Sequence, residues 1–463
     1  MRRKRKISGP KISGRENQQG VIITLVAVFM LFVIGAMAAL SIDVVTLYTA
    51  RSEAQLAADA AALAGARVLA NSGMTSASSA AVGDNAVTLA LAVATQVAAS
   101  SMVGGRTLNA GASTCTAEVC VTIPETGVDF VANPQVTVQV QRADLPTFFA
   151  RIWGTTQVKV AAKATAEAYN PSSLQGTAGG PGVPIAPACV KPWLLPNISP
   201  TTTGGQIFTA ATGAISDTTL LGWKTPAAGG TGRLKTECSV ANGGTADCLA
   251  ASANAPTVWQ YYPGTTDPTT GSFPAPSATS CTGCTGFTDY QRSIAGCVQT
   301  PISCNSLVNV DTNAYGTRDT ETGTAVNTLT HSTGGGGDKV DTAVATPPAG
   351  TEPFQFLAGA ENPIVLSGAM ADRTDVMLSD SLVTVPVIDT TTVWPPAAYP
   401  QVQIIGFVQL FLNPTGAAAP ASGHIHTQVI NLVGCGDGAG GATGQALLGN
   451  GASAVAVRLI SPP

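Results

Sequence analysis

The longest uninterrupted apolar segment of the chain runs from Val21 to Ile42, and Asp43 ends it. As a helix, the 22 residues of this segment would extend about 33 Å, which matches the roughly 30 Å hydrocarbon core of a bilayer. A core helix of a soluble protein would normally carry more polar side chains than Thr24 and Ser41. The pattern therefore predicts a transmembrane helix over residues 21–42.

A helical pattern continues directly after the span, in an alanine-rich stretch that contains no proline before Asn71. Apolar side chains recur there at steps of three and four residues, which is the spacing of one helix face. Because small side chains let another helix approach closely, we predict that this stripe contacts partner subunits. Its members are Leu47, Ala50, Ala54, Ala57, Ala61, Ala64 and Val68.

Within the span, Gly35 and Ala39 form a pair of small residues four positions apart. Such pairs allow two membrane helices to pack closely, so this one is a candidate contact with a partner span. The alternative is that the pair reflects the abundance of alanine and glycine in this region.

The pattern changes from helical to strand-like between residues 76 and 169. We expect a second helix over about 76–101, followed by a small β-rich region over about 106–169. In this region "EVCVTIP", "PQVTVQVQRAD" and "TQVKVAAKATAEAY" alternate or run apolar like strands, and "LPTFFARIWG" reads as a short amphipathic helix. Residues 170–188 are rich in proline and glycine and predict a linker.

The remaining segment, residues 189–463, is predicted to be mostly β, with sandwich or barrel-like packing. Its clearest strand patterns are "SDSLVTVPVID", "QVQIIGFVQLFLN", "HIHTQVINLVG" and "SAVAVRLISP". Residues 305–350 read as an extended loop. The whole chain is thus expected to be α+β, with five parts: a basic segment over 1–20, the span over 21–42, a helical and β-rich module over 43–169, the linker, and the C-terminal domain.

Charge sets the expected orientation of the span. Residues 1–19 carry seven Lys and Arg against one Glu, and such an excess favours the cytoplasmic side. We therefore expect a single-pass protein of the bacterial cytoplasmic membrane, with the bulk of the chain periplasmic or extracellular. A cleaved signal peptide is the alternative, because Ala36-Met37-Ala38 resembles a cleavage site. The apolar run is longer than a usual signal core, which favours a retained anchor.

All ten cysteines follow the span, where an oxidising compartment would favour disulfides. Spacing alone leaves their pairing open, although Cys115 with Cys120 and Cys238 with Cys248 would close small local loops. The pair Cys281 and Cys284, followed by Cys297 and Cys304, also permits a zinc site or redox chemistry. We predict structural disulfides for these residues and for the remaining two, Cys189 and Cys435.

The sequence offers little support for catalysis. It contains no G-x-S-x-G, S-x-x-K, H-E-x-x-H or P-loop motif. His424 and His426 would face the same way on a strand and could join Asp437 or Glu361 around a metal, but two exposed polar side chains are the simpler interpretation. His331 lies in a polar stretch. We expect a non-enzymatic protein with no cofactor, metal site or small-molecule substrate.

No segment after the span combines a basic patch with aromatic residues, so nucleic acid is not an expected partner. The expected partners are the membrane and other protein subunits.

The segment from Gly20 to Leu69 resembles the N-terminal module of the TadE/TadG-like family of Flp pilus-assembly proteins. The resemblance rests on the span, on Asp43, on Arg51 and on the run from Gln55 to Ala66, "QLAADAAALAGA". It extends more weakly through "TFFARIWG" and "VKVAAKATAEA" to residue 169. The resemblance implies a role in a tight-adherence (Tad) pilus or secretion apparatus.

Two departures narrow that role. A type IV prepilin would carry Glu at the fifth position after the processing glycine, whereas Leu25 stands at the fifth position after Gly20. The Asp-x-Ser-x-Ser motif of von Willebrand A-type domains, found in other TadG-like proteins, is also missing, because Asp267 and Asp389 begin sequences that fail at its last position. The expected role is an assembly component that is not the major pilin. The alternatives are an envelope adhesion module that uses the same anchor, or an exported hydrolase.

Overall fold

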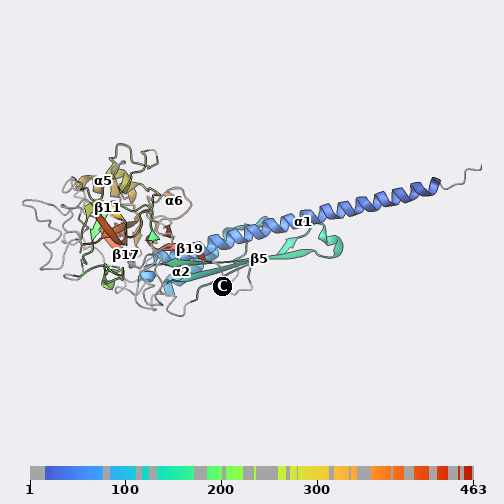
Figure 1. Cartoon of the computed structure of the whole chain (residues 1–463), viewed down its shortest axis with the longest axis horizontal. Coiled ribbons are helices and arrows are strands. Elements are labelled where there is room, and N and C mark those ends of the chain that lie inside the picture. The colour runs from blue at the N-terminus through green and yellow to red at the C-terminus, as the bar shows by residue number, and fades with distance from the viewer. Residues whose placement is uncertain are drawn as a thin grey trace, which may run out of the picture.

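The computed structural model of the 463-residue chain describes residues 16–76, 84–110, 117–124, 133–170, 185–200, 205–222, 234–235, 259–266, 272–278, 280–311, 318–332, 335–340, 356–376, 379–390, 401–416, 425–435, 447–448 and 453–460. One long helix, α1 (Glu16–Asn71), projects from an elongated body whose larger, β-rich end lies away from the N-terminus (Figure 1). The observed architecture is α+β, as predicted.

The helix α1 joins the predicted span and the alanine-rich stretch without a break. Its 56 residues extend about 84 Å. The sequence between residues 16 and 71 lacks proline and is rich in alanine and leucine, which favour the helix. A second helix, α2 (Asp84–Ser100), packs against it and ends close to the predicted residue 101. The prediction began at residue 76, and residues 77–83 lie outside the described residues.

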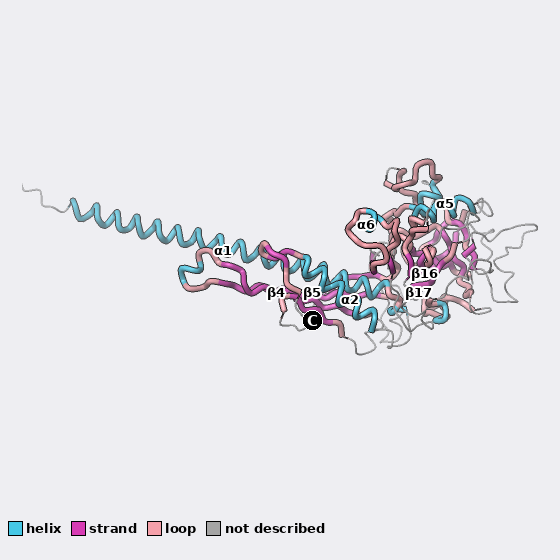
Figure 2. Tube along the Cα trace, turned by 180° about the vertical axis from the view of Figure 1, so that it is seen from behind, coloured by secondary structure: helices cyan, strands magenta, loops and turns pink. Residues whose placement is uncertain are grey.

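A four-stranded antiparallel sheet lies along the second half of α1, in the order β19-β5-β4-β3 (Figure 2). Its long strands form the hairpin of β4 (Gln135–Pro146) and β5 (Gln157–Tyr169). Valines alternate with polar residues in β4, and Val136, Val138 and Val140 all point into the core. The flanking strands are β3 (Val119–Thr122) and β19 (Ala456–Ile460). We refer to α1 from Asp43 onward, α2 and this sheet as the stalk.

The strand β19 comes from the far end of the chain. It pairs with residues 165–169 of β5, so that Ala456 lies opposite Tyr169 and Ile460 opposite Thr165. The prediction placed this segment within the C-terminal domain over 189–463. The chain instead returns to the stalk, because the edge of β5 offers unpaired backbone groups that β19 satisfies.

The larger end, which we call the head, comprises the described residues between 185 and 448. Its central sheet has the order β10-β7-β15-β16-β11, with β17 also pairing with β16. All neighbours are antiparallel except β7 and β15. The strands are β7 (Trp193–Pro196), β10 (Tyr262–Pro263), β11 (Leu307–Asn309), β15 (Leu382–Ile388), β16 (Gln401–Leu412) and β17 (Thr427–Gly434).

The two faces of this sheet are covered differently. Val383, Val385 and Val387 share a core cluster with residues of α4 (Asp289–Ala295) and α5 (Asp319–Leu329). On the opposite face, Phe411 stacks on Phe356 of a three-stranded sheet, with a centroid distance of 4.9 Å. That sheet consists of β12 (Lys339–Val340), β13 (Phe356–Leu357) and β14 (Asp375–Val376). The predicted sandwich is thus only partly correct: a small second sheet covers one face of the central sheet, and helices cover the other face.

The helix α5 also corrects the prediction of an extended loop over residues 305–350. Its sequence, rich in threonine with an internal glycine, has weak helix propensity, so the pattern gave no helical signal. Tertiary packing stabilises it, because Ala325 and Val326 are fully buried and the Thr322 hydroxyl lies within hydrogen-bonding distance of Tyr261 and Tyr290.

The remaining elements are short. They are the strands β1 (Met102–Val103), β2 (Arg106–Thr107), β6 (Ile185–Ala186), β8 (Leu234–Lys235), β9 (Trp259–Gln260) and β18 (Leu447–Leu448), the helix α6 (Pro363–Leu366), and the 3-10 turns η1 (Met74–Ser76), η3 (Ala150–Trp153) and η5 (Thr218–Leu220).

Candidate functional site

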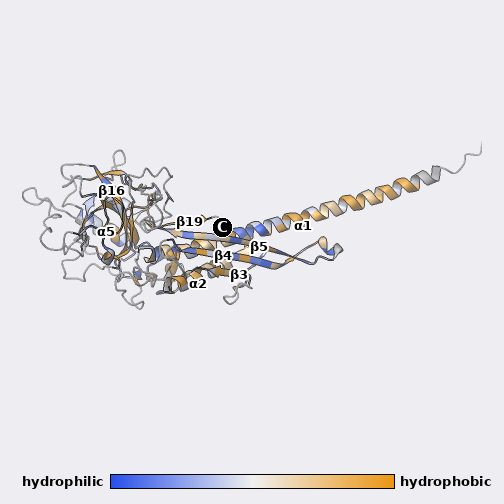
Figure 3. Ribbon diagram, turned by 60° about the horizontal axis from the view of Figure 1, so that its bottom comes forward, coloured by the Kyte–Doolittle hydropathy of each residue, from blue (hydrophilic) through white to orange (hydrophobic). Residues whose placement is uncertain are grey.

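The N-terminal half of α1 exposes its apolar side chains on all sides. Leu31, Phe32 and Ile34 are 73%, 68% and 62% exposed, and the projecting arm is almost uniformly hydrophobic (Figure 3). In the part of the chain that the structure describes, this is the one helix long and apolar enough to cross a membrane. An apolar helix that the protein leaves uncovered fits a single-pass membrane anchor.

The predicted small-residue pair lies in this arm. Gly35 is exposed, and a Cβ placed on it would meet no atom within 4 Å. Ala39 is only 8% exposed. The surface around Gly35 is therefore open, and its contact with a partner span stays a prediction.

Asp43, the first charged residue after the span, holds the tip of the β4–β5 hairpin. One carboxylate oxygen, Oδ1, accepts the N–H of Phe148 at 2.9 Å. The other, Oδ2, accepts the N–H of Phe149 at 3.0 Å and that of Ala150 at 2.7 Å. These amides lie at the start of η3, where backbone N–H groups have no partner within the turn. The hairpin is thereby attached to α1 at the end of the span.

The environment of Asp43 favours its charged form. The residue is 3% exposed, and this burial opposes ionisation. The hydrogen bonds from Phe148, Ala150 and Phe149 outweigh it and lower the pKa of the carboxyl below 3.8. A carboxylate saturated by three amides presents little free charge to its surroundings. The end of the apolar segment marks the position of Asp43, but no local pattern indicates its hydrogen-bond partners, which lie more than 100 residues away.

The alanine stripe is an internal surface of the stalk. Ala50, Ala54, Ala57, Ala61 and Val68 are at most 6% exposed, and Leu47 packs against the same core. Ala64 is half-buried. The sheet and α2 cover the face that these residues form. We predicted that this stripe contacts partner subunits. In the structure it instead contacts the chain's own sheet and second helix, because small side chains allow these elements to pack closely.

Gly65 shows how close this packing is. A Cβ at this position would lie 2.9 Å from Val136 Cγ1 of β4 and 3.2 Å from Ala94 Cβ of α2. Glycine is therefore needed where α1 passes between the sheet and the second helix.

Charged residues also hold β4 near the tip of the hairpin, through Arg106 of β2 and Glu118 beside β3. Arg106 pairs with Glu118 and with Asp144, and Asp144 also accepts from Arg142 Nε at 2.8 Å. The Arg106 hydrogen bond lowers the pKa of Glu118, and burial only partly opposes this. The cluster is internally compensated, so its function is to hold the strands together.

A buried polar network joins the stalk to the head. Asn170 Nδ2 donates to the carbonyl oxygen of Leu432 at 3.1 Å, and Asn431 Nδ2 donates to that of Ala70 at 2.7 Å. The Ser76 hydroxyl donates to Asn431 Oδ1 at 3.1 Å. Because every one of these groups is buried, separating stalk and head would leave them unsatisfied. The two parts are therefore firmly connected.

Seven of the ten predicted disulfide cysteines are described, and all seven are bonded. The disulfides join Cys189 to Cys297, Cys281 to Cys284 and Cys304 to Cys435. Cys120 is also in a disulfide. Cys115, Cys238 and Cys248 lie outside the described residues. The structure thus settles pairings that the spacing left open.

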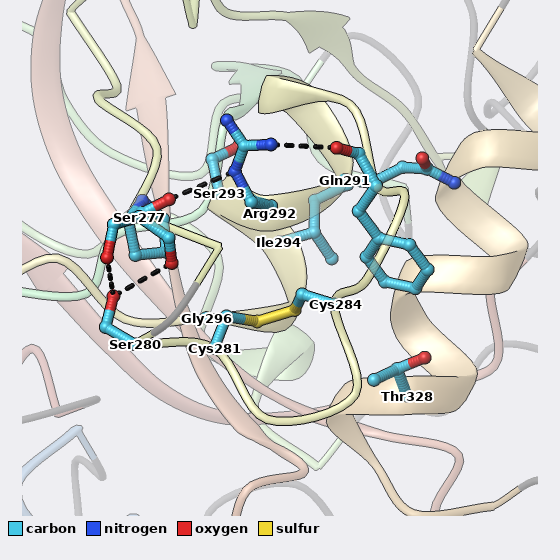
Figure 4. Close-up of a disulfide and its surroundings, with 12 residues drawn as sticks. Ser277, Ser280, Cys281, Cys284, Gln291, Arg292, Ser293, Ile294, Gly296 and Thr328 are labelled. Carbon is cyan, nitrogen blue, oxygen red and sulfur yellow. Dashed lines mark hydrogen bonds between the residues drawn. A yellow bond between two sulfur atoms is a disulfide. The ribbon is translucent and has the colours of Figure 1, made fainter.

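The Cys281–Cys284 disulfide closes a short loop that packs on the end of α4 (Figure 4). Close by, Arg292 Nε donates to the carbonyl oxygen of Pro276 at 3.1 Å. Lys191 holds the same helix end, because its Nζ donates to the carbonyl oxygens of Ile294 and Gly296 at 2.6 and 2.7 Å. Burial lowers the pKa of Lys191 to about 7. This lysine was not singled out in the sequence.

The candidate metal ligands are described only in part. Of the predicted set, His424 and Asp437 lie outside the described residues, as does Asp267. No group of three or more His, Cys, Asp or Glu side chains that could hold a metal ion occurs within the described part of the chain. His331 instead pairs with Asp380, with 2.9 Å between Nε2 and Oδ2.

Comparison with known proteins adds one result. Residues 20–68 match the family model of Flp pilus-assembly TadE/G-like proteins. The N-terminal segment is TadE/G-like. The match covers the span, Asp43 and the alanine stripe, and it confirms the resemblance predicted there. No curated protein and no solved structure matches the chain. The TadE/G-like segment thus lies within one element, α1, which contains both the candidate membrane span and the central helix of the stalk.

Proposed function

We propose that this protein is a non-enzymatic, membrane-anchored component of a Tad/Flp-type pilus assembly or secretion apparatus, with its β-rich head outside the cytoplasmic membrane. One observation carries the proposal: the TadE/G-like residues 20–68 lie in a single continuous helix. The first half of this helix is the exposed apolar arm, and its second half is the central helix of the stalk.

The build of the stalk supports a role as a rigid spacer. From Asp43 to Asn71 the helix rises about 42 Å without a break. The buried contacts of Asn170 and Asn431 then fix the head to its end. A rigid connection of this kind would keep the head at a set distance from the membrane, where it meets other subunits of the apparatus.

The surface available to such subunits is the exposed side of α1. Leu56 lies there with 65% of its surface exposed, on the side opposite the buried alanines. An apolar side chain at this position, about 21 Å along the helix beyond the end of the span, suits contact with another subunit helix.

The test is partner recovery from the native bacterium with the tagged full-length chain. We expect secretion ATPase and Tad membrane-platform subunits to co-purify, and Leu56→Glu to reduce their recovery. Leu366→Glu is the matched control, because Leu366 is 71% exposed but belongs to the head. Deleting the gene should abolish surface pili or secretion. Normal pili together with no recovered subunits would contradict the proposal and favour an independent adhesion module.

Orientation is tested separately. Reporter fusions at both ends, with N-terminal sequencing of the mature protein, should show a retained N-terminus in the cytoplasm and the head outside. A mature protein that begins after Ala38 would contradict the retained anchor.

A further inference from the structure

The exposed apolar surface of α1 does not stop at the end of the predicted span. Beyond Asp43, Val44 and Val45 are 57% and 63% exposed, and Tyr48 is 77% exposed. From Val21 to Tyr48 the helix rises about 41 Å, which is the thickness of a bilayer with its headgroup regions. The apolar surface is thus long enough to reach through the interface and not only through the hydrocarbon core.

Asp43 would ordinarily prevent such an extension, because a free carboxylate is costly near lipid. Here its two oxygens accept three backbone N–H groups of the hairpin tip, and the residue is 3% exposed. The same contacts place the hairpin tip at the level of Asp43. Phe148 in this tip is 65% exposed, and aromatic side chains are favoured at the membrane interface.

Next to the tip, α1 and β5 enclose a groove of about 340 Å³. Val44, Leu47 and Tyr48 line it from the helix, and Val158 lines it from the strand. Its charged groups are two cations, Arg51 from α1 and Lys159 from β5.

These cations are unpaired within the described part of the chain. Arg51 and Lys159 are exposed, and so is Arg151 in the hairpin tip. None of the three has an ion-pair or hydrogen-bond partner among the residues that the structure describes. A groove with apolar walls and two cations matches the two parts of an anionic phospholipid, its acyl chains and its phosphate.

We propose that the hairpin tip and this groove form a second membrane contact. Phe148 enters the interface of the leaflet where the span emerges, and the groove binds an anionic phospholipid whose phosphate is held by Arg51 and Lys159. The stalk is then fixed to the membrane at two points, which sets its tilt, whereas a single helix would leave the tilt free.

Photo-crosslinking of the full-length protein in phosphatidylglycerol nanodiscs tests the tip. A photoreactive phenylalanine analogue replaces Phe148, with Phe29 in the span and Leu366 in the head as controls, since all three are 64–71% exposed. We expect lipid adducts at positions 29 and 148 and none at 366. Adducts at 29 but not at 148 would overturn this inference and leave the anchor intact. Lack of adducts at both would contradict the anchor as well.

Lipid retention in native mass spectrometry tests the groove. We expect the double variant Arg51→Ala and Lys159→Ala to retain phosphatidylglycerol roughly tenfold more weakly. Lys163→Ala is the matched control, because Lys163 is exposed on the same strand but does not line the groove. The exchange Arg51→Lys and Lys159→Arg should keep retention.

Inorganic phosphate separates a lipid site from a phosphate site. Added phosphate should not displace the retained lipid, because it lacks the acyl chains that the apolar wall contacts. Displacement by phosphate, or equal retention by the double variant and Lys163→Ala, would overturn the lipid assignment.

Discussion

The core of the stalk consists largely of alanine and valine, whereas the head packs tryptophan, tyrosine and phenylalanine around its sheet. Small side chains bury little area each, but they let α1 lie close to α2 and the hairpin. Trp193, Tyr261 and Phe407 are fully buried in the head, where disulfides add further constraint. The stalk should therefore be sensitive to enlarged side chains, and the head to lost cross-links.

The largest effect should come from opening a long-range disulfide in the head. Cys304 and Cys435 are separated by 131 residues, and Cys281 and Cys284 by three. From loop closure we expect Cys304→Ala with Cys435→Ala to lower the free energy of unfolding by about 5 kcal/mol, and Cys281→Ala with Cys284→Ala by about 2 kcal/mol. Chemical denaturation followed by tryptophan fluorescence measures both. Equal losses would show that loop length does not decide the effect.

The next effect concerns the alanine packing of the stalk. Ala61 is fully buried and Ala60, its neighbour, is exposed. Ala61→Leu should lower the stability of the stalk by about 1–3 kcal/mol through overpacking, and Ala60→Leu should leave it nearly unchanged. Hydrogen exchange of the β4 amides reports the stalk separately from the head. If the two variants behaved alike, the packing of this face would differ from that described above.

A smaller, local effect is expected at the hairpin tip. Asp43→Asn removes the charge that accepts three N–H groups, so the amides of Phe148, Phe149 and Ala150 should lose exchange protection. Asp59→Asn is the control, because the Asp59 carboxylate accepts from Gln55 on the same helix. Unchanged protection in Asp43→Asn would mean that other contacts hold the tip.

Protonation of Asp43 should weaken the same three hydrogen bonds as the substitution Asp43→Asn. Its pKa is lower in the folded protein than the ordinary 3.8, so its contribution is complete above that value. The contribution is lost as pH falls through the lowered folded pKa. Protection of the three amides should therefore persist at pH 4 and decline only in stronger acid.

The smallest effect should be the titration of His331 in the head. The hydrogen bond to Asp380 raises the pKa of His331 above 6.5, and burial only partly opposes this. Its contribution to stability is thus complete below pH 6.5 and is lost as pH rises through the raised folded pKa. The difference in unfolding midpoint between the wild type and His331→Asn should shrink as pH rises across that range. A difference that stays constant with pH would assign the pH dependence to another group.

Local patterns predicted the elements well where they were long and periodic. The span, the alanine-rich helix, β4, β5, β15, β16 and β17 all lie where the apolar spacing placed them. The helix α5 was not predicted, because its threonines and glycine have low helix propensity. The burial of Ala325 and Val326 stabilises it. The hydrogen bonds of Asp43 to the hairpin tip were not predicted either, since its partners lie 105 to 107 residues away.

By itself, the sequence determined the candidate membrane span, the helical stripe of small residues, the TadE/G-like character of residues 20–68 and the prediction that the cysteines form disulfides. Composition and spacing, on which these rest, are local properties of the chain. Only the tertiary structure decided what the stripe contacts, which cysteines pair and where β19 lies. Those outcomes depend on which distant segments satisfy each buried surface and each free strand edge, and no local pattern contains that information.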